Sequence, residues 1–214
     1  MAERGRPRNF DRAQALQKAM EVFWSKGYEA ASLAELTEAM GINSPSLYGA
    51  FGSKEELFKE AVELYRDTAG GASRRALQDA ASAREGIQAM LMAAADRFTS
   101  PGTPPGCMIV LGAPSGSVNH ASVGGFLCDS RREMQARIQA RLSAGVASGE
   151  LPATTDTKSL AAFYTTVLHG MSIQARDGAN RKTLQSVARQ AMCAWDALTG
   201  SGPPSGVPPG PARS

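Results

Sequence analysis

Hydrophobic and polar positions along the first seventy residues follow the pattern of short helices joined by tight turns. In residues 10–26, apolar side chains recur every three or four positions and polar side chains occupy the opposite face, which predicts an amphipathic helix. Gly27 follows at the position of a C-terminal glycine cap. A Ser-x-x-Glu capping box starts at Ser32 and predicts a second helix that ends at Gly41.

Similar signals predict a third and a fourth helix. Asn43 is a favourable N-cap, and Pro45 falls in the first turn of the third helix, where proline is tolerated. Gly49 and Gly52 surround the exit of this helix, and a second Ser-x-x-Glu pattern starts at Ser53 and predicts a helix to about residue 67. Short helices with a glycine in the turn between the second and the third are typical of a helix-turn-helix.

The rest of the chain has longer and less sharply capped helical segments, so the pattern as a whole predicts an all-α fold. Residues 107–113 form an apolar run that fits either a buried strand or a buried helix, and its periodicity does not choose between them. Residues 199–214 are rich in Gly, Pro and Ser, cannot bury a core and are predicted to be disordered. The predicted later helices are 83–98, 126–147, 157–176 and 181–198.

Composition excludes several classes of protein. The chain has 214 residues, of which 43% are hydrophobic and 20% are charged, as in an ordinary soluble globular protein. No apolar run approaches the roughly 18 residues that a membrane-spanning helix needs, and the N-terminus does not have the pattern of a secretory signal. The three cysteines are too few and too widely spaced for a disulfide framework or a metal site, which predicts a cytoplasmic protein.

Charge by itself does not indicate a nucleic-acid partner. The net charge is +3, but residues 1–70 contain more Asp and Glu than Lys and Arg. Attraction to phosphates supplies most non-specific affinity for DNA, so an acidic N-terminal region is unusual for a DNA-binding protein. The first twelve residues contain four arginines and are the basic exception.

The motif itself points to a family. Residues 27–58, GYEAASLAELTEAMGINSPSLYGAFGSKEELF, closely resemble the DNA-binding domain of TetR-family repressors, and the resemblance covers residues 10–60 without a gap. It implies a three-helix N-terminal DNA-binding domain followed by a larger helical domain for ligand binding and dimerisation. Residues 105–108 and 168–177 are similar to one branch of the family. The expected division is a DNA-binding domain with a basic arm (1–52), a connecting helix (53–71), a sensing and dimerisation domain (72–199) and a disordered tail (200–214).

The outward face of residues 43–49 is free to enter a major groove, because the apolar residues of the motif pack the helices against one another. Ser44 and Ser46 are candidates for contacts with base edges. The resemblance implies phosphate contacts by Tyr48, Lys54 and Ser32. The predicted DNA-binding residues are Arg4, Arg6 and Arg8, as a minor-groove arm, and Ser32, Asn43, Ser44, Pro45, Ser46, Tyr48, Gly49 and Lys54.

Each of these residues has a structural alternative. Tyr48 fits a core aromatic residue with a solvated hydroxyl, Lys54 fits a solvated lysine at a helix start, and a basic N-terminus need bind nothing. Thr37 departs from the family pattern, since many members carry alanine at this tight helix crossing. Its extra bulk must be packed or hydrogen-bonded.

The sequence contains no catalytic constellation, so the chain is predicted not to be an enzyme and to need no cofactor or metal. The two histidines, His120 and His169, lack the spacing of a metal site or of a base paired with a nucleophile. One alternative stays open. Cys107 is a candidate for the reactive thiol of an oxidant or electrophile sensor, or of a thiol enzyme, although a cysteine that leads an apolar run is more often buried.

The predicted function is a repressor that a small molecule releases from a near-palindromic operator. The homodimer is expected to form through the last two helices, which are rich in small residues, and to place two recognition helices about 34–36 Å apart. The sensing domain is expected to bind a small, largely apolar ligand, or else to contain an ordinary core. The candidate pocket residues are Phe98, Met108, Leu111, Phe126, Phe163, Tyr164 and Val167.

Overall fold

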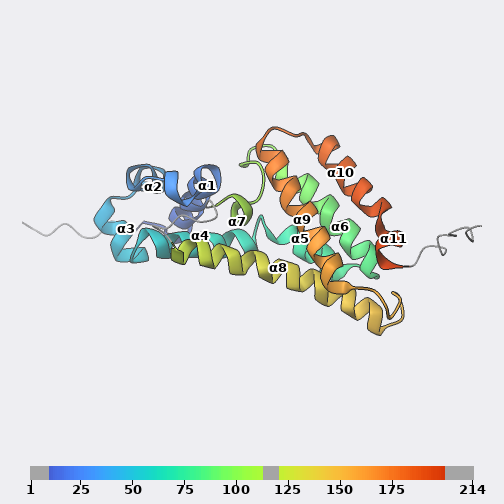
Figure 1. Ribbon diagram of the computed structural model, residues 1–214. Coiled ribbons are helices and arrows are strands. Elements are labelled where there is room, and N and C mark those ends of the chain that lie inside the picture. Colours follow the sequence, from blue (N-terminus) through green and yellow to red (C-terminus); the bar gives the residue numbers. More distant parts are fainter. Residues whose placement is uncertain (1–9, 113–120, 201–214) are drawn as a thin grey trace, which may run out of the picture.

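A computed structural model describes residues 10–112 and 121–200, which form an elongated, all-helical molecule (Figure 1). Helix α3 lies at one end of the molecule, α10 and α11 lie toward the other end, and α8 runs along most of its length. The first four helices are α1 (Arg12–Ala30), α2 (Leu33–Met40), α3 (Ser44–Phe51) and α4 (Lys54–Asp67). The later helices are α5 (Gly71–Asp79), α6 (Ala83–Phe98), α7 (Met108–Leu111), α8 (Ala121–Ala147), α9 (Thr157–Arg176), α10 (Arg181–Cys193) and α11 (Trp195–Thr199).

The predicted caps of the N-terminal helices are present. The Ser32 side chain accepts a hydrogen bond from the Glu35 backbone N–H, and the Glu35 carboxylate accepts one from the Ser32 N–H, so the first capping box is complete. Asn43 caps α3 through the N–H of Ser46 at 2.9 Å. At α4, the Ser53 side chain accepts from the Glu56 N–H at 3.0 Å. These local hydrogen bonds set where α2, α3 and α4 begin.

Helix α1 continues beyond its predicted end. Gly27 has a φ of 80° and interrupts the helical backbone, but the segment resumes and ends at Ala30. The break coincides with a close approach of the chain, because a Cβ on Gly27 would lie 3.1 Å from the carbonyl oxygen of Gly112. The N–H of Tyr28 donates to the same carbonyl at 2.7 Å. Glycine therefore allows both the left-handed conformation and this contact.

The later helices differ from the prediction in three places, and a fourth resolves an open alternative. Helices α6 and α9 have the predicted bounds, whereas α8 begins before residue 126 and the predicted helix 181–198 divides into α10 and α11 at Ala194. Helix α5 was not predicted. The ambiguous apolar run near Cys107 contains the short helix α7 rather than a strand.

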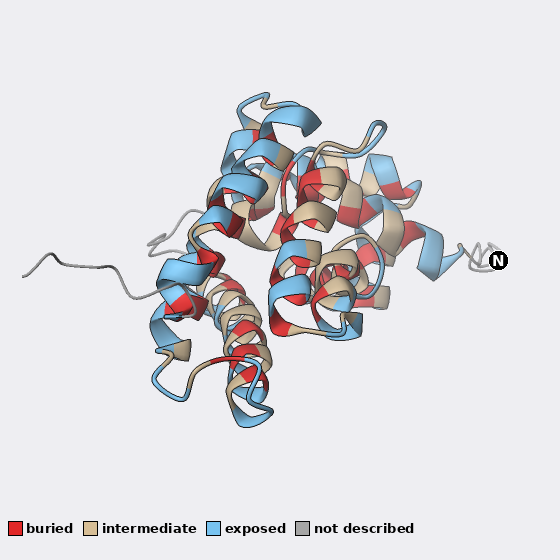
Figure 2. Ribbon diagram, turned by 90° about the vertical axis from the view of Figure 1, so that its right-hand side faces the viewer, coloured by how far each residue is buried: buried red, intermediate tan, exposed pale blue. Residues whose placement is uncertain are grey.

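Two hydrophobic cores hold these helices together, and Figure 2 shows the buried positions on the sides of helices that face one another. The first core lies among α1–α4 and includes an aromatic cluster in which Phe58 contacts Phe23 and Tyr28 at centroid distances of 5.0 and 5.1 Å. It also contains Met108, Val123 and Leu127 from α7 and α8. The N-terminal helices are thus packed partly by later parts of the chain. The second core lies among α5, α6 and α8–α11.

Candidate nucleic-acid interface and sensor cavity

Helix α3 presents a polar face outward, as the motif predicts. Leu47 and Phe51 are buried and anchor the helix on the first core, and the opposite face contains the remaining side chains. Tyr48 has 45% of its surface exposed, which makes it one of the few large apolar side chains on the surface. Asn43, Ser44, Pro45 and Gly49 are also exposed, and Ser46 is half-buried. The face is therefore free of the chain's own core, as a groove-reading helix requires.

The start of α2 has the chemistry of an anion site. The Lys26 ammonium hydrogen-bonds the Glu35 carboxylate, and this contact together with the bonds from Ser32 holds the pKa of Glu35 at about 2. The side chains of Ser32 and Glu35 are thus used in the cap, while the N–H groups of the first helical turn have no intrahelical acceptor. Thr37, in the middle of α2, donates its hydroxyl to the Leu33 carbonyl at 2.9 Å, so its extra bulk is hydrogen-bonded.

Every Lys and Arg in residues 10–60 has a partner within the chain. The Lys54 ammonium lies 4.5 Å above the centroid of the Tyr28 ring, and partial burial lowers its pKa. The other four cations form ion pairs: Arg12 with Glu60, Lys18 with Glu21, Lys26 with Glu35 and Lys59 with Glu55. The predicted phosphate contact of Lys54 therefore requires its ammonium group to bind DNA while it remains against the Tyr28 ring. Arg4, Arg6 and Arg8 lie outside the described residues.

A cavity of about 100 Å³ lies between α4–α9 in the second half of the molecule. Of the seven predicted pocket residues, only Phe98 lines it. Met108 is buried in the first core, Phe126 packs half-buried against that core, and Leu111 is half-buried. Phe163 is 37% exposed on the outer side of α9. Tyr164 is buried in the second core and donates its hydroxyl to the Ala191 carbonyl at 3.4 Å, and Val167 packs against the same core.

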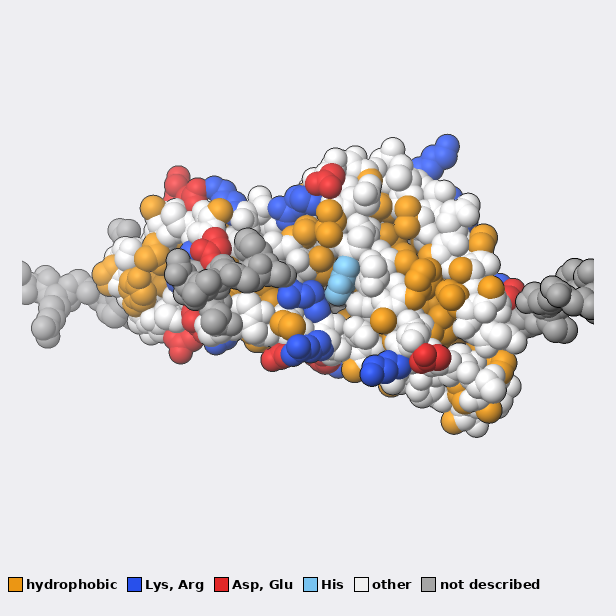
Figure 3. Space-filling view, in the orientation of Figure 1, with side chains coloured by type: hydrophobic (Ala, Val, Ile, Leu, Met, Phe, Trp, Pro, Cys, Tyr) orange, Lys and Arg blue, Asp and Glu red, His pale blue; other side chains and the backbone are white. Residues whose placement is uncertain are grey.

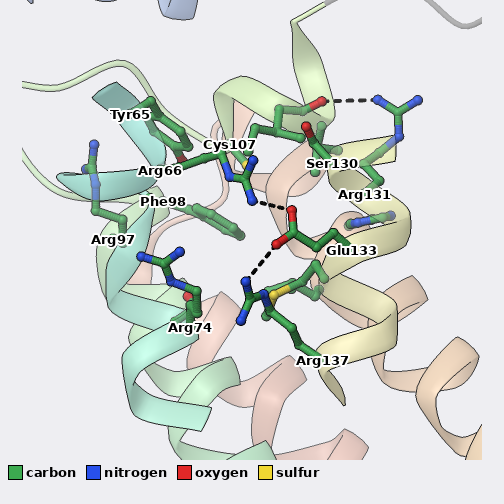
Figure 4. Close-up of a pocket in the computed structure, with 17 residues that line it drawn as sticks. Tyr65, Arg66, Arg74, Arg97, Phe98, Cys107, Ser130, Arg131, Glu133 and Arg137 are labelled. Atoms are coloured by element: carbon green, nitrogen blue, oxygen red, sulfur yellow. Dashed lines mark hydrogen bonds and ion pairs between the residues drawn. The ribbon is translucent and has the colours of Figure 1, made fainter. Parts of the chain in front are cut away.

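The lining of the cavity contains more positively charged side chains than the sequence analysis predicted. Arg66, Arg74, Arg97, Arg131 and Arg137 all line it, together with a single described carboxylate, Glu133. Figure 4 shows the guanidinium groups of Arg66 and Arg137 directed at Glu133 from two sides. The Arg137 Nη2 to Glu133 Oε1 distance is 2.6 Å, and these contacts lower the pKa of Glu133. Sequence reasoning missed the arginines, because they lie on four helices and resemble ordinary surface residues.

Cys107 lies on the wall of this cavity, at the start of α7. Its backbone N–H donates to the Ser172 hydroxyl at 2.8 Å. The neighbouring Tyr65 is almost fully buried, and burial, followed by its contact with Cys107, raises the pKa of Tyr65 well above its usual value. The described residues contain no group of three His, Cys, Asp or Glu side chains that is suited to a metal ion.

The two stretches that resemble one branch of the family, 105–108 and 168–177, pack against each other and against α1. Besides the bond between Cys107 and Ser172, the Arg176 guanidinium donates to the Pro105 carbonyl at 3.3 Å. It also donates to the carbonyls of Trp24 and Ser25, both at 2.8 Å. The Trp24 indole N–H in turn donates to the Gly106 carbonyl at 3.1 Å. These bonds join the last turn of α1 before the Gly27 break to α9.

The outer faces of α9, α10 and α11 expose large apolar side chains to solvent. Phe163 and Ile173 on α9, Val187 on α10 and Leu198 on α11 are between 37% and 48% exposed. Figure 3 shows hydrophobic side chains gathered over α9 and α10. Several of the small residues that were expected at a subunit interface, including Ala161, Ala175, Ala188 and Ala191, are instead buried in the second core. Within the described residues, no helix is long and apolar enough to cross a membrane.

Comparison with known proteins agrees with this architecture. Residues 15–61 match the family described as bacterial regulatory proteins of the tetR family, and residues 83–192 match the tetracyclin repressor-like C-terminal domain. The chain is 38% identical over 197 residues to the HTH-type transcriptional repressor ComR of Escherichia coli (strain K12), which covers 91% of this chain and 93% of that protein. It is 40% identical over 111 residues to the repressor BdcR of the same organism, which covers 52% of this chain and 56% of that one.

Solved structures show the same fold. A cysteine mutant of the TetR family transcriptional regulator CifR, complexed with 26-bp double-strand operator DNA, superposes with a TM-score of 0.85. It is 49% identical, and the match covers 89% of this chain and all of that one. Two family models, a repressor that matches over nearly its full length and an operator-bound structure thus indicate the same family. The chain belongs to the TetR family of DNA-binding transcriptional regulators, which are not enzymes.

Proposed function

We propose that the protein is a homodimeric repressor that acts in the cytoplasm and leaves a near-palindromic operator when a small molecule occupies its sensor cavity. The observation that carries the proposal is the outward presentation of α3 by buried Leu47 and Phe51. The similarity of this chain to CifR, whose structure contains operator DNA, supports an orientation of α3 toward DNA. The proposed division is a DNA-binding domain (1–52), a connecting helix (53–71), a sensing and dimerisation domain (72–199) and a tail (200–214).

In this proposal, α3 inserts into the major groove. Ser44 and Ser46 contact base edges, while Asn43, Pro45 and Gly49 line the groove-facing surface. The Tyr48 hydroxyl, the Lys54 ammonium and the N-terminal turn of α2 at Ser32 hold the neighbouring phosphates. Because the cations of residues 10–60 are already partnered, the arm with Arg4, Arg6 and Arg8 supplies most of the uncommitted positive charge.

The dimer forms through α9 and α10. Exposed Phe163 and Ile173 lie on one side of α9, and Val187 and Leu198 extend the apolar surface along α10 and α11. Covering this surface by the same surface of a second copy gives an isologous four-helix interface. That symmetry places two α3 helices on one face of the DNA, as a near-palindromic operator requires.

Helix α4 connects the cavity to the DNA-binding surface. Its N-terminal end follows α3 directly, and Arg66 near its C-terminal end forms an ion pair with Glu133 of α8 at the cavity wall. A ligand that alters this contact favours a different position of α4 and hence a different separation of the α3 helices. Release from DNA requires that the ligand bind the two arrangements with different affinity.

The test is operator binding by the full chain, measured by fluorescence anisotropy on duplexes from the DNA that flanks its own gene. We expect Tyr48→Phe to lose about 30-fold in affinity, because each of the two subunits loses one hydrogen bond to a phosphate worth about 1 kcal/mol. Tyr48→Ala should lose more, and both variants should remain dimers by sedimentation. Equal affinity for any duplex sequence at low salt, or a monomeric protein, would contradict the proposal.

A second candidate is a thiol sensor, favoured by the position of Cys107 on the cavity wall beside Tyr65. In this version an electrophile alkylates the thiol and the adduct replaces the reversible ligand. The chain contains its own control, since Cys193 is exposed on α10. Mass spectrometry after brief treatment with iodoacetamide should show Cys107 modified before Cys193 and operator affinity reduced. Faster modification of Cys193, with unchanged DNA binding, would exclude this candidate.

A further inference from the structure

The charges on the cavity wall identify a class of ligand that the sequence did not predict. Five arginines line the cavity together with one described carboxylate, Glu133. Arg66 and Arg137 bond to this carboxylate, whereas Arg131 donates to the Ile109 carbonyl at 3.1 Å. Burial, followed by the nearby positive charge of Arg131, lowers the pKa of His169, so this imidazole is neutral at pH 7. The described side chains that line the cavity thus carry an excess of positive charge, which favours a ligand that combines a negative charge with an apolar part.

The carboxylate of Glu133 shows how the site binds an anion. Its two oxygens accept hydrogen bonds from two different arginines: Arg66 on α4, and Arg137, which lies on α8 as Glu133 does. Arg74 on α5 has no comparable partner among the described residues, since it forms an ion pair there only with Asp67, at 4.0 Å, and the Asp67 side chain is 75% exposed. Figure 4 shows Arg74 beside Phe98, on the same side of the cavity as Arg66. One guanidinium is therefore available next to an aromatic ring.

Arg97 also lines the cavity, but its guanidinium points away from Glu133 (Figure 4). The Nη1 atom of Arg97 donates to the Thr103 hydroxyl at 2.8 Å, and its guanidinium lies 4.3 Å from the centroid of the Trp24 ring. Its Nη2 atom is buried and has no hydrogen-bond partner among the described residues.

The rest of the lining limits the shape of the ligand. Apolar side chains line the rest of the cavity: Phe98, Ile109, Val110, Met134 and Leu168. The volume of about 100 Å³ is smaller than the ~150 Å³ of a cavity known to admit benzene. An anion with a short aliphatic skeleton fits both limits, whereas inorganic phosphate leaves the apolar wall uncovered.

We propose that the sensor cavity binds a small organic carboxylate, whose head group is held by Arg74 together with the Arg66–Glu133–Arg137 network and whose aliphatic part packs against Phe98 and Leu168. The effect of this ligand on operator binding rests on the proposed function. The proposed carboxylate replaces the expectation of a largely apolar ligand. A carboxylate near Arg66 competes with Glu133 for this arginine, which weakens the tie between α4 and α8.

The experiment is isothermal titration calorimetry of the full-length dimer at constant ionic strength with butyrate, butyramide and inorganic phosphate. We expect butyrate to bind at least tenfold more tightly than butyramide, which has the same shape without the charge, and more tightly than phosphate. Arg74→Gln should weaken butyrate binding about tenfold, because it removes a charge-assisted hydrogen bond. The matched control is Arg75→Gln, the next residue on α5, which is exposed and does not line the cavity.

Butyramide binding equal to that of butyrate, equal losses in the two variants, or no butyrate binding in the millimolar range would overturn the proposal. Tighter binding of phosphate would do so too. Operator affinity is measured in parallel with and without butyrate, so that the ligand class and ligand-controlled release from DNA are tested separately. If the operator is bound but butyrate fails these tests, only the ligand class is wrong. If butyrate binds as expected and operator affinity is unchanged, ligand-controlled release is wrong and the ligand class stands.

Discussion

Arg176 joins the sensing helices to the DNA-binding helices, and its removal gives the sharpest test of that connection. The break at Gly27 leaves the carbonyls of Trp24 and Ser25 at the end of a helical segment, because the N–H of Tyr28 donates to Gly112. The Arg176 guanidinium supplies both missing donors at 2.8 Å. A cation is also favourable at this end of a helix dipole. Arg176 thus caps α1 from α9.

The expected cost of Arg176→Ala follows from these contacts. A hydrogen bond to a charged group contributes about 1.5–3 kcal/mol when buried, and the half-exposed position of Arg176 reduces each short bond to about 1 kcal/mol. The two short bonds together give about 2 kcal/mol, which for a chain of this length lowers Tm by about 4–8 °C. Operator affinity should fall as well, because α1 packs against α2 and positions it.

Differential scanning calorimetry and operator anisotropy measure the two effects on the same preparation. The matched control is Arg132→Ala, which removes an arginine whose pair with Asp129 is highly exposed on α8 and should cost less than about 0.5 kcal/mol. A Tm for Arg176→Ala within about 1 °C of the control would refute the account of Arg176 as a cap. Loss of stability with unchanged operator affinity would refute the further step that this cap positions the DNA-binding helices.

Three further outcomes are expected. Replacing Arg4, Arg6 and Arg8 with Gln should make the slope of log K against log salt shallower by up to about 5 per dimer in anisotropy titrations, and an unchanged slope would rule out phosphate contacts by this arm. Burial, followed by the positive charge of Arg131, lowers the pKa of His169, so the free energy of unfolding should decrease as the pH falls below about 6.5, the pKa of the unfolded state. His169→Gln should remove this decrease in urea-unfolding measurements. A variant whose stability follows the same pH profile as the wild type would argue against the assignment to His169. Phe58→Ala should cost about 3–5 kcal/mol in the same urea assay, because Phe58 is fully buried against Phe23 and Tyr28, and a loss below about 1 kcal/mol would show that the cluster repacks.

The sequence predicted the N-terminal helices well because their signals are local. Ser32 with Glu35, Asn43 with the backbone of Ser46, and Ser53 with that of Glu56 act within a single helical turn. The outward face of α3 follows from the same information, since burial of Leu47 and Phe51 leaves the polar positions outside. The helix breaks at Gly27, where the sequence predicted its end, but the contact of Gly27 with Gly112 and the helical residues that follow, up to Ala30, were not predicted, because this contact joins residues far apart in the chain.

Only the tertiary structure decided where the sensor cavity lies and what charge it has. Phe163 and Tyr164 are adjacent in sequence and equally apolar, yet one is exposed on α9 and the other is buried in the second core. Arg66, Arg74 and Arg137 belong to three helices and resemble solvated side chains until those helices pack around one space. Helix caps and helix periodicity depend on residues that are close in sequence. A cavity depends on which helices come together, and the packing of the whole chain determines this.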